Sequence, residues 1–207
     1  MTVFLKSYRS LCLVDSGPLS QKLVRQLLLS PLCVEVSYRG PALSLEGVSK
    51  EGMKKLNRIT GNCVGNFDRA FCGKLLDWSS VGDVDFVRKA SEAGVSHLSL
   101  VLPGFSERKA ANLLARISGI HRVSCFIPQR VSGISTSPRG ELIDAVHHIV
   151  SQFLPSKFRD ISSDHLSLAM RLNSELCDPG VSKTGNPALE MLMYADCMQV
   201  IGRDDRI

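Results

Sequence analysis

An alternation of apolar runs and helix signals over residues 95–139 constrains the fold of this 207-residue chain more than any other feature. An apolar run, 98–102, leads into a Pro-Gly turn and a helix predicted over 107–118, and a second apolar run, 123–127, follows. The predicted helix begins after a serine that can cap it and ends at Gly119, as helices commonly do. A strand, a helix and a strand in this order predict a β-α-β unit.

The same alternation extends toward the N-terminus. Strand-like runs are centred near residues 11, 33, 63, 97 and 122, and apolar residues recur at helical spacing in the segments 18–29, 49–60 and 83–93 between them. Helices that end at a glycine and are followed by an apolar strand are typical of stacked β-α units. We therefore predict an α/β fold with a mostly parallel sheet of about four to five strands flanked by helices.

The last third of the sequence contains only helix signals. Helices are predicted to begin at Pro138, at Ser162 or Ser163, and at Pro187. In the second of them, leucines at every fourth position are expected to form the buried face: Leu168, Leu172 and Leu176. This pattern predicts an α/β domain over residues 1–155 and a C-terminal helical subdomain, 156–207, packed on it.

The cysteines and histidines do not form a metal site in the sequence. There are seven cysteines at irregular spacing, no Cys-x-x-Cys pair, and no helical spacing among the five histidines. Four cysteines in or beside predicted strands are expected to be small buried apolar residues: Cys12, Cys33, Cys63 and Cys125. Free thiols favour a reducing compartment, with the cytoplasm as the main expectation and the mitochondrion as a minor alternative.

Several kinds of chemistry lack their motifs. The sequence has no P-loop, no Gly-x-Gly-x-x-Gly, no complete catalytic set and no apolar run of the ~20 residues that cross a bilayer. No cofactor, catalytic residue or membrane span is therefore predicted. The segment 13–17 resembles the Asp-Ser-Gly turn of retroviral-type aspartic proteases, but those are small all-β proteins. We interpret Asp15 as a residue at which a strand ends and a turn begins.

Charge is concentrated at the front of the chain. Residues 1–60 hold nine lysines and arginines against four acidic residues, while the whole chain has a net charge of +5. This distribution favours an anionic partner. The first functional hypothesis is a non-enzymatic, basic binding or assembly protein associated with RNA. Its contacts are predicted on one face of the 49–60 helix, at Lys50, Lys54, Lys55 and Arg58.

Two alternatives remain open. In a parallel sheet, the loops 103–109 and 128–139 would both lie at the carboxyl edge, where ligands usually bind. The alternative function is an α/β enzyme or small-ligand binder that recognises a phosphorylated compound there. Its predicted anion-binding residues are Ser106, Arg108, Lys109, Arg130, Ser137 and Arg139. The second alternative is a subunit that acts only through protein–protein interactions in a larger complex.

Overall fold

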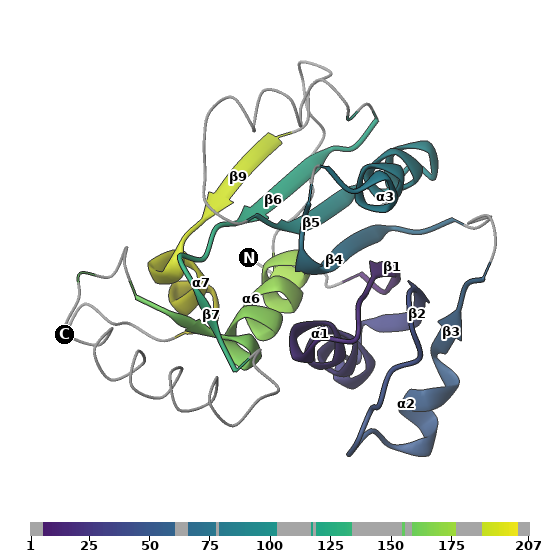
Figure 1. The fold of residues 1–207 in the computed structure, drawn as a ribbon. Coiled ribbons are helices and arrows are strands. Elements are labelled where there is room, and N and C mark those ends of the chain that lie inside the picture. The colour runs from purple at the N-terminus through teal and green to yellow at the C-terminus, as the bar shows by residue number, and fades with distance from the viewer. Residues whose placement is uncertain are drawn as a thin grey trace.

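A seven-stranded sheet in the order β3-β2-β1-β4-β5-β6-β9 forms the centre of the protein, and all its neighbouring strands are parallel (Figure 1). The computed structural model describes residues 6–60, 66–77, 79–102, 117, 119–133, 155, 159–176 and 188–202. The sheet confirms the predicted α/β class. Its strands are β1 (Tyr8–Leu13), β2 (Cys33–Arg39), β3 (Leu56–Arg58), β4 (Arg69–Leu75), β5 (His97–Val101), β6 (Arg122–Phe126) and β9 (Ala188–Leu192).

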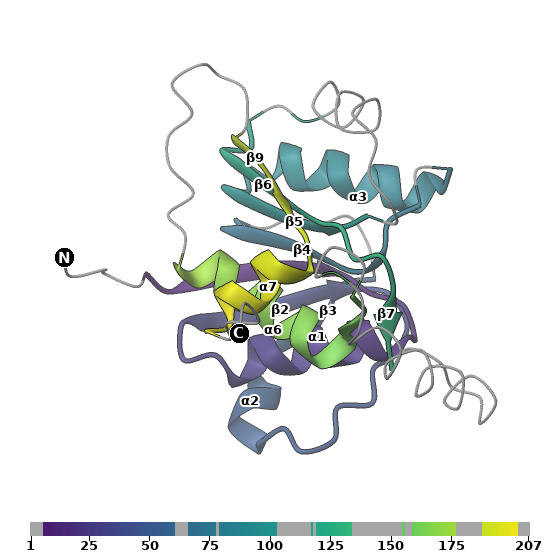
Figure 2. The same ribbon diagram turned by 90° about the vertical axis from the view of Figure 1, so that its left-hand side faces the viewer.

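Helices cover both faces of this sheet. α1 (Pro18–Leu29) and α6 (Ser163–Leu176) lie on one face and α3 (Val81–Glu92) lies on the other (Figure 2). Two shorter helices, α2 (Lys50–Lys54) and α7 (Tyr194–Val200), lie on the side of α1 and α6. A separate pair of short parallel strands is formed by β7 (Val131–Ser132) and β8 (Ile161–Ser162), which precedes α6 directly.

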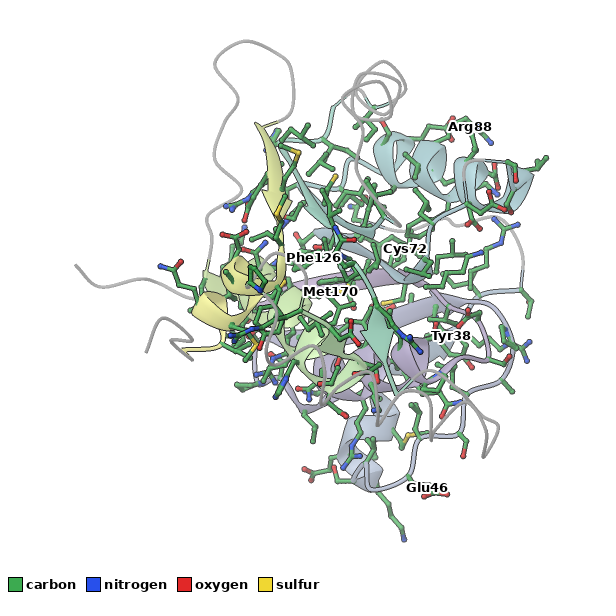
Figure 3. The ribbon with its side chains drawn as sticks, turned by 60° about the vertical axis from the view of Figure 1, so that its left-hand side comes forward. Tyr38, Glu46, Cys72, Arg88, Phe126 and Met170 are labelled. Carbon is green, nitrogen blue, oxygen red and sulfur yellow. The ribbon has the colours of Figure 1, made fainter. Side chains whose placement is uncertain are left out.

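The core has one apolar cluster on each face of the sheet. Phe71, Phe126 and Met170 belong to the cluster beneath α1 and α6, and Figure 3 labels Phe126 and Met170. Leu98 and Phe86 belong to the cluster beneath α3. Because successive strand residues point to opposite faces, a strand covered on both sides needs apolar residues throughout. The continuous apolar run expected at 98–102 is thus the mark of a central strand.

The predicted helix over 49–60 forms only in its first half. α2 ends at Lys54, and Leu56–Arg58 is the edge strand β3, paired with β2. Gly52 weakens the helix from within, since glycine lowers helix stability by roughly 1 kcal/mol relative to alanine. Backbone hydrogen bonds from Val36 N to Lys55 O (2.8 Å) and from Ile59 N to Tyr38 O (2.9 Å) then hold the segment in the sheet.

The C-terminal segment is also not purely helical. Ala188–Leu192 is strand β9 at the sheet edge, where a helix from Pro187 was predicted. α6 forms as expected, but Leu176 is exposed and the buried face holds Leu166, Met170 and Asn173. The leucine spacing was misleading because this helix buries polar groups. The predicted helices at 107–118 and from Pro138 lie outside the described residues, and the division of the chain at residue 155 stays a prediction.

A layer of buried polar side chains, here called the polar layer, connects the amino-terminal halves of the strands to α6. Its centre is the Ser124 hydroxyl, which accepts a hydrogen bond from Asn173 Nδ2 (2.9 Å) and lies 2.7 Å from His97 Nε2. Beside it, Arg122 of β6 forms an ion pair with Glu190 of β9. These contacts attach α6 and β9 to β6, and they link β6 to β5.

The other half of the polar layer lies beneath the end of α6. Arg69 donates to the Ser174 hydroxyl (3.1 Å), and its guanidinium lies 3.9 Å from the centre of the Tyr8 ring. The Tyr8 hydroxyl donates to Glu175 Oε1 (2.8 Å). Burial raises the pKa of Tyr8 and lowers the pKa of Arg69. A buried polar group is costly without a partner, so these pairs fix the position of α6.

Among the described residues, no helix is long and apolar enough to cross a membrane. Five cysteines are described, and all are free and buried: Cys12, Cys33, Cys72, Cys125 and Cys197. Burial raises the pKa of Cys72, Cys125 and Cys197 to about 12. These thiols are therefore protonated and inert at neutral pH. Cys63 lies outside the described residues.

Protonation of His97 should make the protein less stable in acid. Burial, with Arg122 and Arg69 nearby, lowers the pKa of His97 to about 3, whereas an unfolded histidine titrates near pH ~6.5. As the pH falls from about 6.5 toward about 3, only the unfolded state takes up this proton, so unfolding becomes easier by at most about 1.4 kcal/mol per pH unit. Replacing His97 with Gln should remove that contribution to the slope of unfolding free energy against pH, measured by urea denaturation.

The exposed His121 provides a matched control for this measurement. His121→Gln should leave the slope between pH 6.5 and 4.5 close to that of the wild type. Equal slopes in the wild type and His97→Gln would contradict the assignment of a buried, neutral His97.

Candidate ligand site at the carboxyl edge of the sheet

The order of the strands reverses between β1 and β4. From β1 the chain adds β2 and β3 on one side, and from β4 it adds β5, β6 and later β9 on the other. When the connections that follow two neighbouring strands run to opposite sides of the sheet, a crevice opens between the carboxyl ends of those strands. Ligands of open parallel sheets bind in this crevice. The candidate site is therefore the edge at which β1 and β4 end, at Leu13 and Leu75.

The turn between β1 and α1 is closed by Asp15. Its Oδ1 accepts the backbone N–H of Gly17 (2.9 Å) and lies 2.7 Å from the Ser20 hydroxyl, which in turn accepts the N–H of Asp15 (2.9 Å). Pro18, the first residue of α1, contributes no N–H. The structure thus agrees with the interpretation of Asp15 as a residue that ends a strand and enters a turn.

The Ser20 hydroxyl also connects this turn to β4. It lies 2.7 Å from the carbonyl oxygen of Gly73, and Ser20 is fully buried. A Cβ on Gly73 would lie 3.2 Å from the Ser20 Cα, so a side chain there would push α1 away from the sheet. The glycine in β4 therefore permits the close packing of α1 on the two strands at the reversal point.

The carboxyl ends of β2 and β3 carry Arg39 and Arg58. Arg39 Nη1 pairs with Asp85 of α3 (3.0 Å), and Arg58 Nε donates to the Gly40 carbonyl oxygen (3.1 Å). Gly40 has φ 151°, and a Cβ on it would lie 2.2 Å from the carbonyl oxygen of Val14. Only glycine fits at this approach, so Gly40 holds the ends of β1 and β2 together.

Among the described residues, several cations at this edge have an acidic partner. Lys74 lies 2.7 Å from Asp83, and Asp83 is almost fully buried at the start of α3. Lys89, Arg88 and Arg39 together hold the pKa of Asp85 well below its usual range. In these pairs the acidic side chains of α3 balance the charges of Arg39 and Lys74, and they attach α3 to β2 and β4.

A further contact brings α6 and the β7 segment to the same edge. Lys22 of α1 donates to the Ser163 hydroxyl (2.8 Å) and to Asp164 Oδ2 (2.6 Å). Ser163 Oγ lies 3.3 Å from the carbonyl oxygen of Gly133, which follows β7. Arg130, which precedes β7, accepts the Ile161 N–H at its carbonyl oxygen (3.1 Å). The segment after β6 therefore returns toward the start of α1.

The predicted anion-binding residues fall mostly outside the described part of the chain. Arg130 lies at the expected edge, whereas the other five are not described: Ser106, Arg108, Lys109, Ser137 and Arg139. The sequence did not identify Asp15, Arg39 or Lys22 as residues of this edge. Asp15 and Arg39 follow predicted strands and Lys22 lies in the predicted helix 18–29, but the sequence does not give the order of the strands that brings them to one edge.

The predicted nucleic-acid contacts do not share a helix face. Lys50 and Lys54 lie on α2, and the Lys55 side chain donates to the Ser30 carbonyl oxygen (3.1 Å). Arg58 lies in the edge strand β3, which follows α2, and not on a helix. The expected stripe with a spacing of four residues is absent because its helix ends before it is complete.

Comparison with known proteins gives matches only among solved structures. No family model and no curated protein matches the sequence. The reductase domain of an aureusimine biosynthetic cluster aligns with a TM-score of 0.53 and 12% identity, covering 91% of this chain and 69% of the other. A short-chain dehydrogenase/reductase from Serratia marcescens aligns with a TM-score of 0.52 and 13% identity, covering 93% and 99%. The chain has a Rossmann-like fold.

These likenesses contradict the hypothesis of a non-enzymatic, RNA-associated protein. The similar structures are of a reductase domain and a dehydrogenase/reductase, so the fold is one that enzymes use. Neither the structure nor the comparisons give support to RNA or protein partners, so the expectations of RNA binding and of membership in a larger complex are wrong. The alternative of an α/β enzyme or small-ligand binder agrees better with the fold.

The first turn does not fit the dinucleotide that this fold commonly holds. Such a cofactor needs a glycine-rich turn and the open amino end of the first helix for its pyrophosphate. Here the turn has one glycine, Gly17, whose N–H is bonded to the Asp15 carboxylate, and Pro18 follows it. The residues present put a negative charge where the pyrophosphate would lie. We therefore derive no reaction step through a dinucleotide.

The approach of Gly40 to β1 gives a direct test of this edge. Gly40→Ala should lower the free energy of unfolding by about 3 kcal/mol or more, because its Cβ would clash with backbone. Gly94→Ala is the matched control, since Gly94 also has positive φ (69°) but a Cβ added to it would have no atom within 4 Å. Its loss should be only about 1–2 kcal/mol, the cost of the left-handed backbone. Equal losses in urea denaturation would contradict the close approach.

Proposed function

We propose that this chain is an α/β enzyme or small-molecule binder that takes a phosphorylated compound at the carboxyl edge of its sheet. The observation that carries the proposal is the reversal of strand order between β1 and β4, because ligands of open parallel sheets bind at that point. The names of the similar structures, a reductase domain and a dehydrogenase/reductase, support chemistry on small molecules.

At the same carboxyl edge as this crevice, on the side of β4, the phosphate is proposed to lie between the segments that follow β5 and β6. β5 ends at Val101 and β6 at Phe126, and the segments that follow them leave the sheet at the same edge because the strands are parallel. Arg130 supplies a cation there. The further proposed contacts are the predicted residues of the same two segments: Ser106, Arg108, Lys109, Ser137 and Arg139. Arginine suits this role because its planar group can donate two hydrogen bonds to one phosphate.

The buried thiols support a reducing compartment as the place of action. The five described cysteines are free and buried, and free thiols persist in a reducing environment. The cytoplasm is the proposed location, with the mitochondrion as the alternative.

Reversal of charge at Arg130 tests the proposed site. Adenosine 5′-monophosphate and ribose 5-phosphate serve as probes, and isothermal titration calorimetry gives their dissociation constants. Arg130→Glu should weaken binding at least about tenfold, because a charge-assisted hydrogen bond is lost and a repulsion is added. The loss should shrink as salt is raised, since exposed charges are screened.

Lys54→Glu is the matched control for this experiment. It makes the same change of charge on α2, away from the carboxyl edge, and Lys54 is exposed. Equal effects of the two substitutions would show that only net charge matters. Failure of the wild type to bind either monophosphate would refute the proposed function.

A further inference from the structure

The amino end of α1 already holds an anion that belongs to the chain itself. The Asp15 carboxylate accepts the Gly17 N–H at 2.9 Å and lies 2.7 Å from the Ser20 hydroxyl, in the place where a bound phosphate would meet the helix. The aligned peptide dipoles give a helix end only about half a positive charge. The Asp15 carboxylate is bonded to Gly17, the residue directly before α1, so a second anion at this helix end is repelled by it.

The carboxylate is also held against moving aside. Ser20 bonds to both the side chain and the backbone of Asp15, and its hydroxyl lies 2.7 Å from Gly73 O in the buried contact with β4. The Cβ of any residue replacing Gly17 would lie 2.9 Å from Asp15 Oδ1, which shows how closely the carboxylate lies over the turn. Opening the turn therefore breaks contacts on α1 and uncovers a buried serine.

We infer that Asp15 is a specificity-determining residue that excludes pyrophosphate from the first β-α turn, so that the ligand of this edge is a monophosphate and not a dinucleotide. This inference rests on the proposed function for the ligand class. The exclusion itself depends only on the Asp15 contacts.

The test compares sodium pyrophosphate and NADP⁺ as probes on the full chain. Asp15→Ala removes both the charge and the hydrogen bonds, and Asp15→Asn removes the charge while keeping an acceptor for the Gly17 N–H. In calorimetric titrations, both variants should bind pyrophosphate at least about tenfold more tightly than the wild type, with NADP⁺ shifting in the same direction. Circular dichroism and thermal melting show whether each variant is folded, and Asp15→Asn carries the test if Asp15→Ala is not.

Asp77→Asn is the matched control. Asp77 follows β4 at the same edge and closes a similar turn, with Oδ1 accepting the Ser79 N–H (2.9 Å) and the Ser79 hydroxyl (2.7 Å). It precedes α3 and not α1, so its neutralisation should leave pyrophosphate binding unchanged. An equal gain in Asp77→Asn would show that any loss of negative charge at the edge suffices, and would overturn the inference.

Two other outcomes would overturn it as well. One is tight binding of NADP⁺ by the wild type, with a dissociation constant below about 100 µM. The other is unchanged pyrophosphate binding in both Asp15 variants. Monophosphate binding is measured separately on the wild type, so its absence refutes the proposed function while the Asp15 variants still report on the turn.

Discussion

A parallel sheet must be covered on both faces, and in this protein the two covers are attached by different kinds of contact. α3 packs on an apolar cluster and is fixed at its start by the ion pairs of Asp83 and Asp85. α6 packs half on apolar residues and half on the polar layer around Ser124. Because hydrogen bonds are directional, the contacts with the polar layer allow only one register of α6 on the strands.

Much of this architecture could be predicted from hydrophobic periodicity alone. The helix over 18–29 and the strands near 33, 98 and 123 follow from it, and they suffice for the fold class. β4 was not assigned because Arg69, Gly73 and Lys74 interrupt its apolar pattern, each for a contact with α6, α1 or α3. β3 and β9 are edge strands with partly exposed faces, and their pairing depends on neighbours distant in the sequence.

The candidate site was harder to predict because it depends on the order of the strands. The loops after β5 and β6 were identified from the rule that ligands bind at the carboxyl edge. The rule could not show that the strand order reverses at β1 and β4, nor that the Asp15 side chain returns to its own helix. A search for sequence motifs looks for glycines in that turn. In this protein the turn is closed by the Asp15 carboxylate and its two hydrogen-bond donors, and no glycine pattern describes that arrangement.

The position of α6 has a consequence for how the chain folds. The strands that it covers end at Phe126, yet α6 spans Ser163–Leu176, so α6 can cover this face of β4, β5 and β6 only after residue 176 has been synthesised. Open sheet faces of unfinished domains are prone to aggregate. In the folded protein α6 covers Arg69, His97 and Ser124 on this face, and such polar side chains are easier to hydrate than apolar ones before α6 arrives. The polar layer can thus protect the nascent chain before it orients the finished one.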